Sequence, residues 1–377
     1  MKNPFIYGEV VMGEDLCDRE NEFREIVRDL KDGERIFLIS PRRYGKSSLI
    51  QNVKLELEKE GYYVAYLDLF GLASLNHFLD IYTKAITSAV ETKLNRISRF
   101  VNEFLGNLRP RVILTPEGLP TVELGYEVMK KDINSLLDET YELAQKIAKK
   151  KRKKFVVIFD EFQEIVNIDG EKNEKRIRAA IQHHNLVSYL FAGSKRHMMY
   201  KMVTDRNRAF YKMARMINLG RLPQDVFAKF LKMRFKKGRI ILEDGVIEKI
   251  FEAAEDYPYN IQFLCHRLWD LKLASGRIII NDIDKAIESI IHDQNMSFIA
   301  LWESFSPHQK KLLIAIAKYG GQNIQSGEFI QIGNLSSPSS VQTSKKRLLK
   351  RDLLDRENGN YYITDVFFKE WIIRKIT

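Results

Sequence analysis

The fold is decided by residues 35–49, which read RIFLISPRRYGKSSL. Residues 35–40 are a short apolar run with β-branched and aromatic side chains, so they predict a buried strand. Apolar side chains then recur along one face of a predicted helix at residues 46–59, and another apolar run predicts a strand at residues 62–69. Strand, loop, helix and strand in this order predict a βαβ unit and therefore a parallel sheet.

The loop between the first strand and the helix matches the pattern G-x-x-x-x-G-K-[ST], except that Ser40 replaces the first glycine. The phosphates of a nucleoside triphosphate require several backbone N–H groups directed at one point and a cation beside the β- and γ-phosphates. Gly45 lets the backbone approach closely, Lys46 supplies the cation, and the Ser47 hydroxyl can bind Mg²⁺. Because the motif lies between a strand and a helix, we expect a P-loop NTPase.

The most apolar predicted strand, residues 155–159, runs directly into two adjacent acids, Asp160 and Glu161. A carboxylate at the end of such a strand can hold Mg²⁺ through its water shell. A second carboxylate beside it can orient and activate an attacking water molecule. We therefore assign Asp160 to the Mg²⁺ ion, together with Ser47, and Glu161 to the role of general base.

A further predicted strand at residues 186–192 ends at Gly193, Ser194 and Lys195. Ligands of open α/β sheets bind at the carboxyl ends of the strands, so the Ser194 hydroxyl is a candidate partner for the attacking water or the γ-phosphate. The alternative is that Ser194 caps the following helix. The sequence leaves both interpretations open, and we count Ser194 among the catalytic candidates.

The remaining elements predict an α/β domain, with helices on both faces of a parallel sheet, followed by two smaller domains. Helices are expected at residues 75–104, 133–150 and 176–184, a hairpin or loop at 109–124, and the last strand of the sheet at 215–219. Four helices then follow, and after them three helices and a short β-wing in the order of a winged helix-turn-helix. We therefore divide the chain into a P-loop domain (1–221), a helical lid domain (222–294) and a winged-helix domain (295–377).

The composition narrows the class of protein further. A hydrophobic content of 45% and a charged content of 29% are typical of a folded globular chain. Cys17 and Cys265 have no Cys-x-x-Cys spacing, so neither a zinc site nor a disulfide framework is expected. No apolar run approaches the roughly 18 residues of a membrane span, so we expect a cytoplasmic protein without membrane contact. The net charge of +11 fits a polyanionic partner or a well-solvated surface.

Several motifs resemble those of the archaeal-type ATPases, prokaryotic P-loop ATPases close to the AAA+ and STAND classes. Residues 41–49 resemble that family's Pro-Arg-Arg-x-Gly-Lys-Thr-Ser-Leu motif, and residues 160–163 and 193–194 resemble its acidic and sensor motifs. Arg19 matches an Arg-Glu motif, and Pro258 matches a lid motif in which Asp256 stands where glycine is usual. The resemblance implies ATP or ADP as the nucleotide, with binding residues Arg19, Pro41, Arg42, Arg43, Tyr44, Gly45, Lys46, Ser47, Ser48 and Pro258.

Three functions remain open at this stage. The first is a slow, Mg²⁺-dependent ATPase that acts as a molecular switch on the lid and winged-helix domains. The second is a DNA-binding regulator with secondary ATPase activity, and the third is a protein-docking module; oligomerisation is compatible with each. The predicted recognition helix at residues 339–353 carries the basic side chains that favour the second: Lys345, Lys346, Arg347, Lys350 and Arg351.

Overall fold

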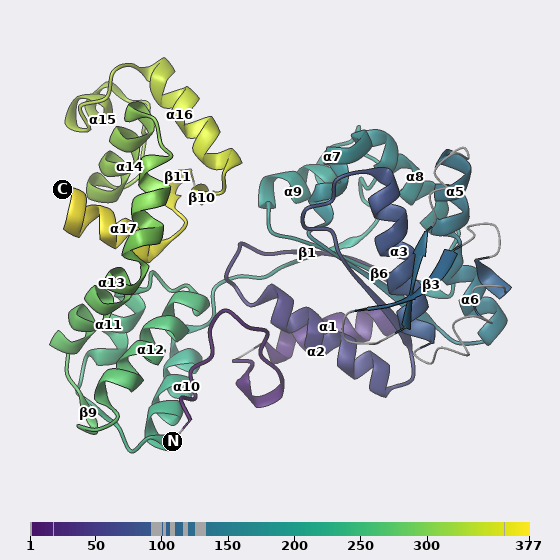
Figure 1. Cartoon of the computed structure of the whole chain (residues 1–377), viewed down its shortest axis with the longest axis horizontal. Helices are drawn as coiled ribbons and strands as arrows, with labels where there is room; N and C mark the ends of the chain where they lie inside the picture. Colours follow the sequence, from purple (N-terminus) through teal and green to yellow (C-terminus); the bar gives the residue numbers. More distant parts are fainter. Residues whose placement is uncertain are drawn as a thin grey trace. The chain divides into compact units, whose positions relative to one another are not determined.

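The computed structural model (Figure 1) describes residues 2–17, 19–91, 100, 103–105, 110–115, 120–124, 133–357 and 359–377. These residues form two compact units. One unit is Val10–Arg221, and the other combines Leu222–Thr377 with the N-terminal segment Met1–Glu9. The boundary after residue 221 coincides with the position where the sequence changes from alternating strands and helices to helices.

A five-stranded parallel sheet organises the unit Val10–Arg221, in the strand order β2-β5-β6-β1-β7. Every residue of β5 and β6 is buried, as expected for central parallel strands covered on both faces. This sheet confirms the predicted α/β fold class. The strands are β1 (Arg35–Ile39), β2 (Tyr63–Asp68), β5 (Phe155–Asp160), β6 (Val187–Gly193) and β7 (Arg215–Asn218).

Helices cover both faces of this sheet. Alternate residues of β5, namely Phe155, Val157 and Phe159, belong to one apolar core with α3, α5, α6, α8 and α9. On the opposite face, α1 packs on β1 and β6, and Ser188 Oγ of β6 donates a hydrogen bond to Leu30 O of α1. The helices are α1 (Glu20–Lys31), α2 (Lys46–Lys59), α3 (Leu75–Val90), α5 (Ile133–Tyr141), α6 (Leu143–Lys151), α7 (Val166–Asp169), α8 (Glu171–Ile181) and α9 (Arg196–Thr204).

Some predicted boundaries differ from the structure. The helix predicted at 75–104 ends at Val90, and residues 92–99 lie outside the described part of the chain. The helix predicted at 133–150 is divided into α5 and α6 at Glu142. The segment predicted as a hairpin or loop contains an antiparallel pair, β3 (Pro110–Leu114) and β4 (Pro120–Leu124). The described residues of this unit also include two short 3-10 helices, η1 (Gly13–Asp15) and η4 (Phe162–Ile165).

The second unit is mainly helical. Its α13 is a single helix of 23 residues that continues through the position at which we divide the lid from the winged helix. The elements are α10 (Gln224–Lys237), β8 (Ile241–Leu242), α11 (Val246–Ala253), α12 (Pro258–Lys272), β9 (Arg277–Ile278), α13 (Asn281–Glu303), α14 (Pro307–Tyr319), α15 (Gly327–Ile332), α16 (Pro338–Lys350), β10 (Leu354–Glu357), β11 (Asn360–Ile363), α17 (Val366–Trp371) and the π-helical turn η5 (Ile372–Ile376).

The N-terminal segment packs within this second unit and not within the P-loop domain, in which the sequence predicts it. Phe5 is buried with its ring centroid 4.5 Å from that of Phe235. The ring of Tyr7 stacks on Phe263 at 4.3 Å between centroids. Apolar and aromatic burial therefore fixes residues 2–9 on α10 and α12.

One basic residue of the predicted recognition helix is buried. Lys345 of α16 is 9% exposed, with Nζ 3.5 Å from Gln325 Oε1 and 5.3 Å from the ring centre of Tyr361 in β11. Its charge is therefore directed into the domain, and we withdraw it from the candidate contacts to a polyanion. Lys346 and Arg347 are exposed, as expected.

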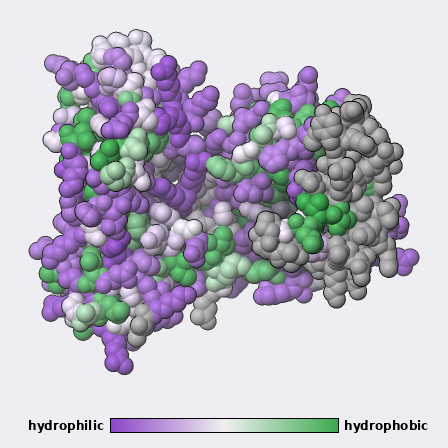
Figure 2. All heavy atoms as spheres, in the orientation of Figure 1, coloured by the Kyte–Doolittle hydropathy of each residue, from purple (hydrophilic) through white to green (hydrophobic). Residues whose placement is uncertain are grey.

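No helix in the described part of the chain combines the length and the apolar character that crossing a membrane requires. The visible face of the molecule mixes hydrophilic and hydrophobic residues in small areas (Figure 2).

Candidate nucleotide-binding site

The loop at residues 40–45 joins the buried strand β1 to the N-terminus of α2. Ser40, which replaces a glycine of the motif, is fully buried; its N–H donates to Gly193 O at 3.2 Å and its Oγ donates to Pro41 O at 3.0 Å. Gly45 is the N-cap of α2 with φ of 81°, a left-handed conformation that a side chain would strain. The loop therefore ends at a helix N-terminus, where free N–H groups and the helix dipole favour phosphate.

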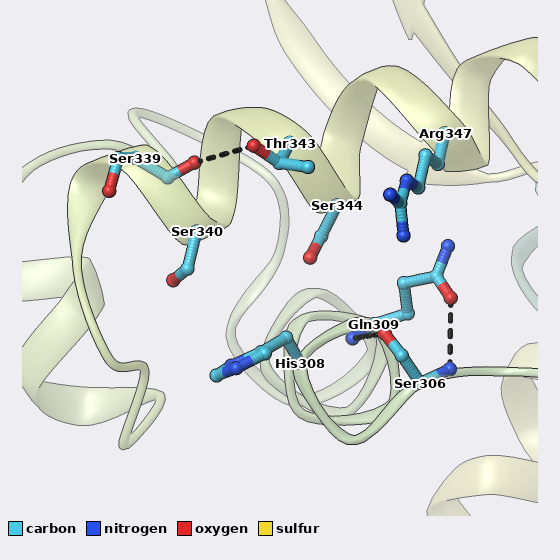
Figure 3. Close-up of a pocket in the computed structure, with 8 residues that line it drawn as sticks. All are labelled: Ser306, His308, Gln309, Ser339, Ser340, Thr343, Ser344 and Arg347. Carbon is cyan, nitrogen blue, oxygen red and sulfur yellow. Dashed lines mark hydrogen bonds between the residues drawn. The ribbon is translucent and has the colours of Figure 1, made fainter.

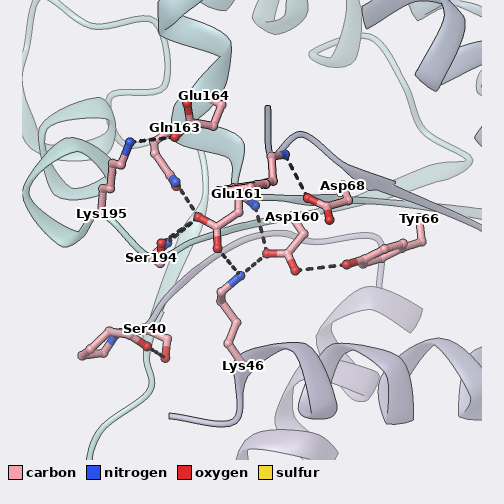
Figure 4. Close-up of polar contacts among 12 residues, drawn as sticks. Ser40, Lys46, Tyr66, Asp68, Asp160, Glu161, Gln163, Glu164, Ser194 and Lys195 are labelled. Atoms are coloured by element: carbon pink, nitrogen blue, oxygen red, sulfur yellow. Dashed lines mark hydrogen bonds and ion pairs between the residues drawn. The ribbon is translucent and has the colours of Figure 1, made fainter. Parts of the chain in front are cut away.

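Lys46, the first residue of α2, lies between the two acids at the C-terminal end of β5, Asp160 and Glu161 (Figure 4). Its Nζ forms an ion pair with Asp160 Oδ1 and lies 3.1 Å from Glu161 Oε1. Tyr66 of β2 donates its hydroxyl to Asp160 Oδ2 at 3.1 Å. The side chains of Lys46 and Asp160 are 7% and 5% exposed, so one ammonium balances two adjacent carboxylates in a region that water barely enters.

Glu161 is held by donors from two neighbouring segments. Ser194 Oγ, just after β6, donates to Glu161 Oε2 at 2.7 Å, and Gln163 Nε2 donates to the same oxygen. Burial raises the pKa of Glu161, but the attraction of Lys46 and these hydrogen bonds outweigh burial and lower the pKa below its usual value. The carboxylate is therefore ionised at neutral pH, which is the form that a general base requires.

Two backbone features determine where Glu161 and Ser194 lie. Glu161 has φ of 50° and ψ of 42°, an unusual left-handed conformation for a residue with a side chain, and such strain is typical of functional sites. At the end of β6, a Cβ on Gly193 would overlap Gln163 Oε1 and Met199 Sδ. Glycine at this position therefore allows β6 to approach Gln163 closely and brings Ser194 to Glu161.

The structure thus brings together four of the predicted site residues: Lys46, Asp160, Glu161 and Ser194. Two residues of the same cluster, Tyr66 and Gln163, were not assigned a role from the sequence. Gln163 is fully buried although it is polar, but its burial depends on β6, which is distant in sequence. Likewise, only the parallel pairing of β2 with β5 brings Tyr66 beside Asp160.

The other predicted nucleotide-binding residues occupy different positions. Arg19 is buried, and its guanidinium donates to Gly220 O at 2.6 Å and Tyr44 O at 3.4 Å while pairing with Glu22. Arg19 therefore stabilises the backbone of the phosphate-binding loop through its hydrogen bond to Tyr44 O. Ser48 Oγ, also next to the loop, accepts a hydrogen bond from Val11 N at 3.1 Å. Direct contact of either side chain with a nucleotide remains a prediction.

The remaining loop residues differ in exposure. Pro41 and Tyr44 are buried, Arg43 is half-buried, and Arg42 and Ser47 are exposed. Pro258 is the first residue of α12 in the second unit. The preceding Asp256 has φ of 59°, so it adopts the conformation for which the related motif uses glycine. Pro258 as a nucleotide-binding residue also remains a prediction.

The oxygen donors at this site fit a Mg²⁺ ion. Ser47 is an exposed residue in the first turn of α2, and Asp160 already binds a cation, the Lys46 ammonium. Mg²⁺ prefers such oxygen ligands and usually takes one or two protein groups, with phosphate and water completing its shell. Ser47 and Asp160 are therefore the residues that would hold the ion.

The sequence matches two protein families in separate regions. Residues 16–263 match a family described as an ATPase domain predominantly from Archaea. Residues 296–374 match a family described as a probable winged helix domain. The first match spans all the residues of the Lys46, Asp160 and Glu161 cluster, and the second spans α14 to α17.

Solved structures share this fold at low sequence identity. A Walker-type ATPase of Pyrococcus abyssi aligns with a TM-score of 0.64 and 18% identity over 97% of this chain and 99% of that chain. The ORC2 protein of Aeropyrum pernix, solved with ADPNP and ADP, aligns with a TM-score of 0.56 and 16% identity over 100% of this chain and 98% of that chain. The ORC1 protein of Aeropyrum pernix, in complex with DNA, aligns with a TM-score of 0.51 and 14% identity over 94% of this chain and 91% of that chain. No curated protein matches the sequence significantly.

Proposed function

Because the chain belongs to the family of ATPase domains found predominantly in Archaea, we propose that it binds ATP at residues 40–47 and hydrolyses it as a molecular switch. The observation that carries this proposal is the buried cluster in which Lys46 joins Asp160 and Glu161, with Ser194 bound to Glu161. A cation from the phosphate-binding loop, a metal-binding acid and a base are the groups that phosphoryl transfer to water requires.

Lys46 has two alternative partners in this account. Without nucleotide, its ammonium binds Asp160 and Glu161 and compensates their charge. When the loop takes up a triphosphate, the ammonium moves to the β- and γ-phosphates and releases both carboxylates. Mg²⁺ held by Ser47 and Asp160 would then neutralise negative charge on the phosphate oxygens.

Glu161 then acts on the attacking water. Its carboxylate accepts the water proton. Hydrogen bonds from Ser194 Oγ, 2.7 Å from Glu161 Oε2, and from Gln163 hold the carboxylate in one orientation. Donors to a carboxylate also stabilise its ionised form, so Ser194 and Gln163 maintain the base between turnovers. In this account Ser194 is a positioning residue for Glu161.

The N-terminal segment provides a physical basis for the switch. Asn52 and Ser48 of α2, the helix that begins with Lys46, hydrogen bond to the backbone of residues 11–13. The preceding residues 2–9 pack on α10 and α12 in the second unit. A small displacement of α2 on nucleotide binding would therefore act on a chain segment anchored in the other unit.

Hydrogen exchange would test the switch. Glu161→Gln would hold bound ATP without turnover, so its ATP state can be compared with the ADP state of the same variant. We expect amides in residues 2–13 and in α10 and α12 to exchange at different rates in the two states. Identical exchange of these segments with ATP and ADP, in protein shown to bind both, would reject the switch and leave a simple ATPase.

Duplex DNA binding is the second candidate function. The sequence of α16 includes four basic residues and no acid, and Lys346, Arg347 and Lys350 are exposed. The similar fold of the ORC1 protein, solved with DNA, adds support at the level of fold. Fluorescence anisotropy at several salt concentrations tests this candidate, because phosphate contacts make affinity fall steeply with salt. No binding of a duplex at low salt would eliminate it.

A further inference from the structure

A polar cavity lies in the winged-helix region, and none of the predicted ATP-site residues lines it (Figure 3). It has a volume of about 260 Å³ and lies between the N-terminal turn of α14 and one face of α16. Both helices belong to the same compact unit. The cavity is lined by Ser306, His308, Gln309, Ser339, Ser340, Thr343, Ser344 and Arg347.

Two buried side chains line this cavity with unused hydrogen-bonding groups. Ser344 is 4% exposed, and its hydroxyl points toward the first turn of α14 without a hydrogen-bond partner in the described part of the chain. Gln309 is 6% exposed; its Oε1 accepts from Ser306 N at 2.9 Å, while its Nε2 makes no hydrogen bond to any described residue. Both groups face the cavity and are free to donate to a polar ligand there.

The electrostatic surroundings favour an anion. Both α14 and α16 have 13 residues and line this cavity with their first turns, and the first turn of α14, which carries Gln309, brings the positive end of its dipole to the side facing Ser344. Arg347 is exposed and forms no ion pair with any described acid. None of the lining residues is acidic. Hydroxyl, amide and guanidinium donors around a positive cavity match a tetrahedral oxyanion.

We propose that this cavity binds a phosphate group, with Ser344 Oγ, Gln309 Nε2 and the Arg347 guanidinium as donors. Every charged residue of α16 is basic, and Lys346 and Lys350 are exposed on the same helix as Arg347; this favours a backbone phosphate of duplex DNA as the source. The choice of source rests on the second candidate function, whereas the phosphate site itself does not. The ligand would be anchored beside α16 without any contact to a base.

Tungstate, a heavy-atom analogue of phosphate, tests the site directly. In co-crystals of the full chain with tungstate, we expect one anomalous peak at the phosphate-binding loop near Lys46 and a second within hydrogen-bond distance of Ser344 Oγ. The loop peak serves as an internal control for oxyanion access. A peak at the loop with none beside Ser344 would overturn the proposed site.

Duplex binding tests the source of the phosphate. Arg347→Gln should weaken duplex affinity by about tenfold or more, whereas Lys346→Gln, which removes the same charge outside the cavity, should weaken it by about two- to threefold. Ser344→Ala should weaken affinity by about three- to tenfold without changing the salt slope, because it removes no charge. Ser297→Ala, at an exposed serine of α13, should have no effect.

The outcomes separate the two parts of the inference. A tungstate peak at Ser344 together with the expected losses of duplex affinity supports both. A tungstate peak without duplex binding, or with equal effects of Arg347→Gln and Lys346→Gln, would overturn the DNA backbone as the source and leave free phosphate as the ligand class.

Discussion

Replacing Lys46 with methionine should destabilise the nucleotide-free protein. Methionine fills much of the space of the lysine stem but supplies no charge, so Asp160 and Glu161 would remain buried side by side without a counter-ion. Breaking a buried ion pair by removing one partner costs about 3–5 kcal/mol. As a matched control on the same helix, Lys54→Met removes a partly exposed surface pair with Glu58 and should cost less than about 1 kcal/mol.

This loss of stability should depend on pH in a defined direction. In the parent, the folded-state pKa of Glu161 is lowered. The stabilisation that the ionised carboxylate gives to the folded state is therefore fully present above the unfolded-state pKa near 4.5, and it is lost as pH falls through the folded-state pKa. In Lys46→Met the attraction of the ammonium is absent, and burial raises the folded-state pKa. The variant then gains stability by taking up a proton at low pH. The difference in free energy of unfolding between the parent and Lys46→Met should therefore be largest at about pH 7–8 and should shrink toward pH ~5.

The positions of the tryptophans allow the unfolding of the two units to be followed separately. All three, Trp269, Trp302 and Trp371, lie in the unit that contains residues 222–377, so tryptophan fluorescence reports only that unit. Far-UV circular dichroism reports both units. In urea titrations, Lys46→Met should shift the dichroism transition of the unit 10–221 to lower urea while the fluorescence transition stays in place. A variant with the parent's transition at pH 8 would refute the proposed charge balance.

Three further substitutions test individual parts of the site. Glu161→Gln should retain ATP binding by calorimetry while phosphate release slows by about 10² or more; an unchanged rate would assign the base elsewhere. Ser194→Ala should slow turnover by about tenfold because one hydrogen bond to a charged group is lost, and Ser194→Thr, which keeps the hydroxyl, should restore much of the rate. Gly193→Ala should destabilise the unit 10–221 by about 1–3 kcal/mol in the urea assay, whereas Gly220→Ala, which has open space at its Cβ, should not.

The sequence was sufficient for the parts of the fold that depend on local patterns. The strand, loop and helix at residues 35–49 are continuous in sequence, and their alternation with later strands defines the parallel sheet. The acids at the end of β5 were predictable because carboxyl ends of parallel strands meet at one edge. Helix ends were predicted less accurately: α13, for example, continues to Glu303, past the boundary expected between residues 294 and 295.

Features that depend on distant partners could not be predicted in this way. Lys345 has the sequence context of an exposed recognition-helix residue, but Tyr361 of the wing and Gln325 draw its side chain inward. Residues 2–9 are next to the P-loop domain in sequence, but Phe5 finds its apolar partners on α10 and α12. Tertiary contacts decide both cases, and neither leaves a periodic pattern in the sequence.

Calorimetric titration of Mg²⁺ and ATP into the nucleotide-free protein tests the central claim most directly, namely that Lys46 and the loop before it form the ATP site. We expect one ATP per chain and parent-like affinity in Lys54→Met. Lys46→Met should lose about 100-fold in affinity because a charged hydrogen bond to phosphate is removed. Equal affinity of Lys46→Met and the parent for ATP would contradict the account.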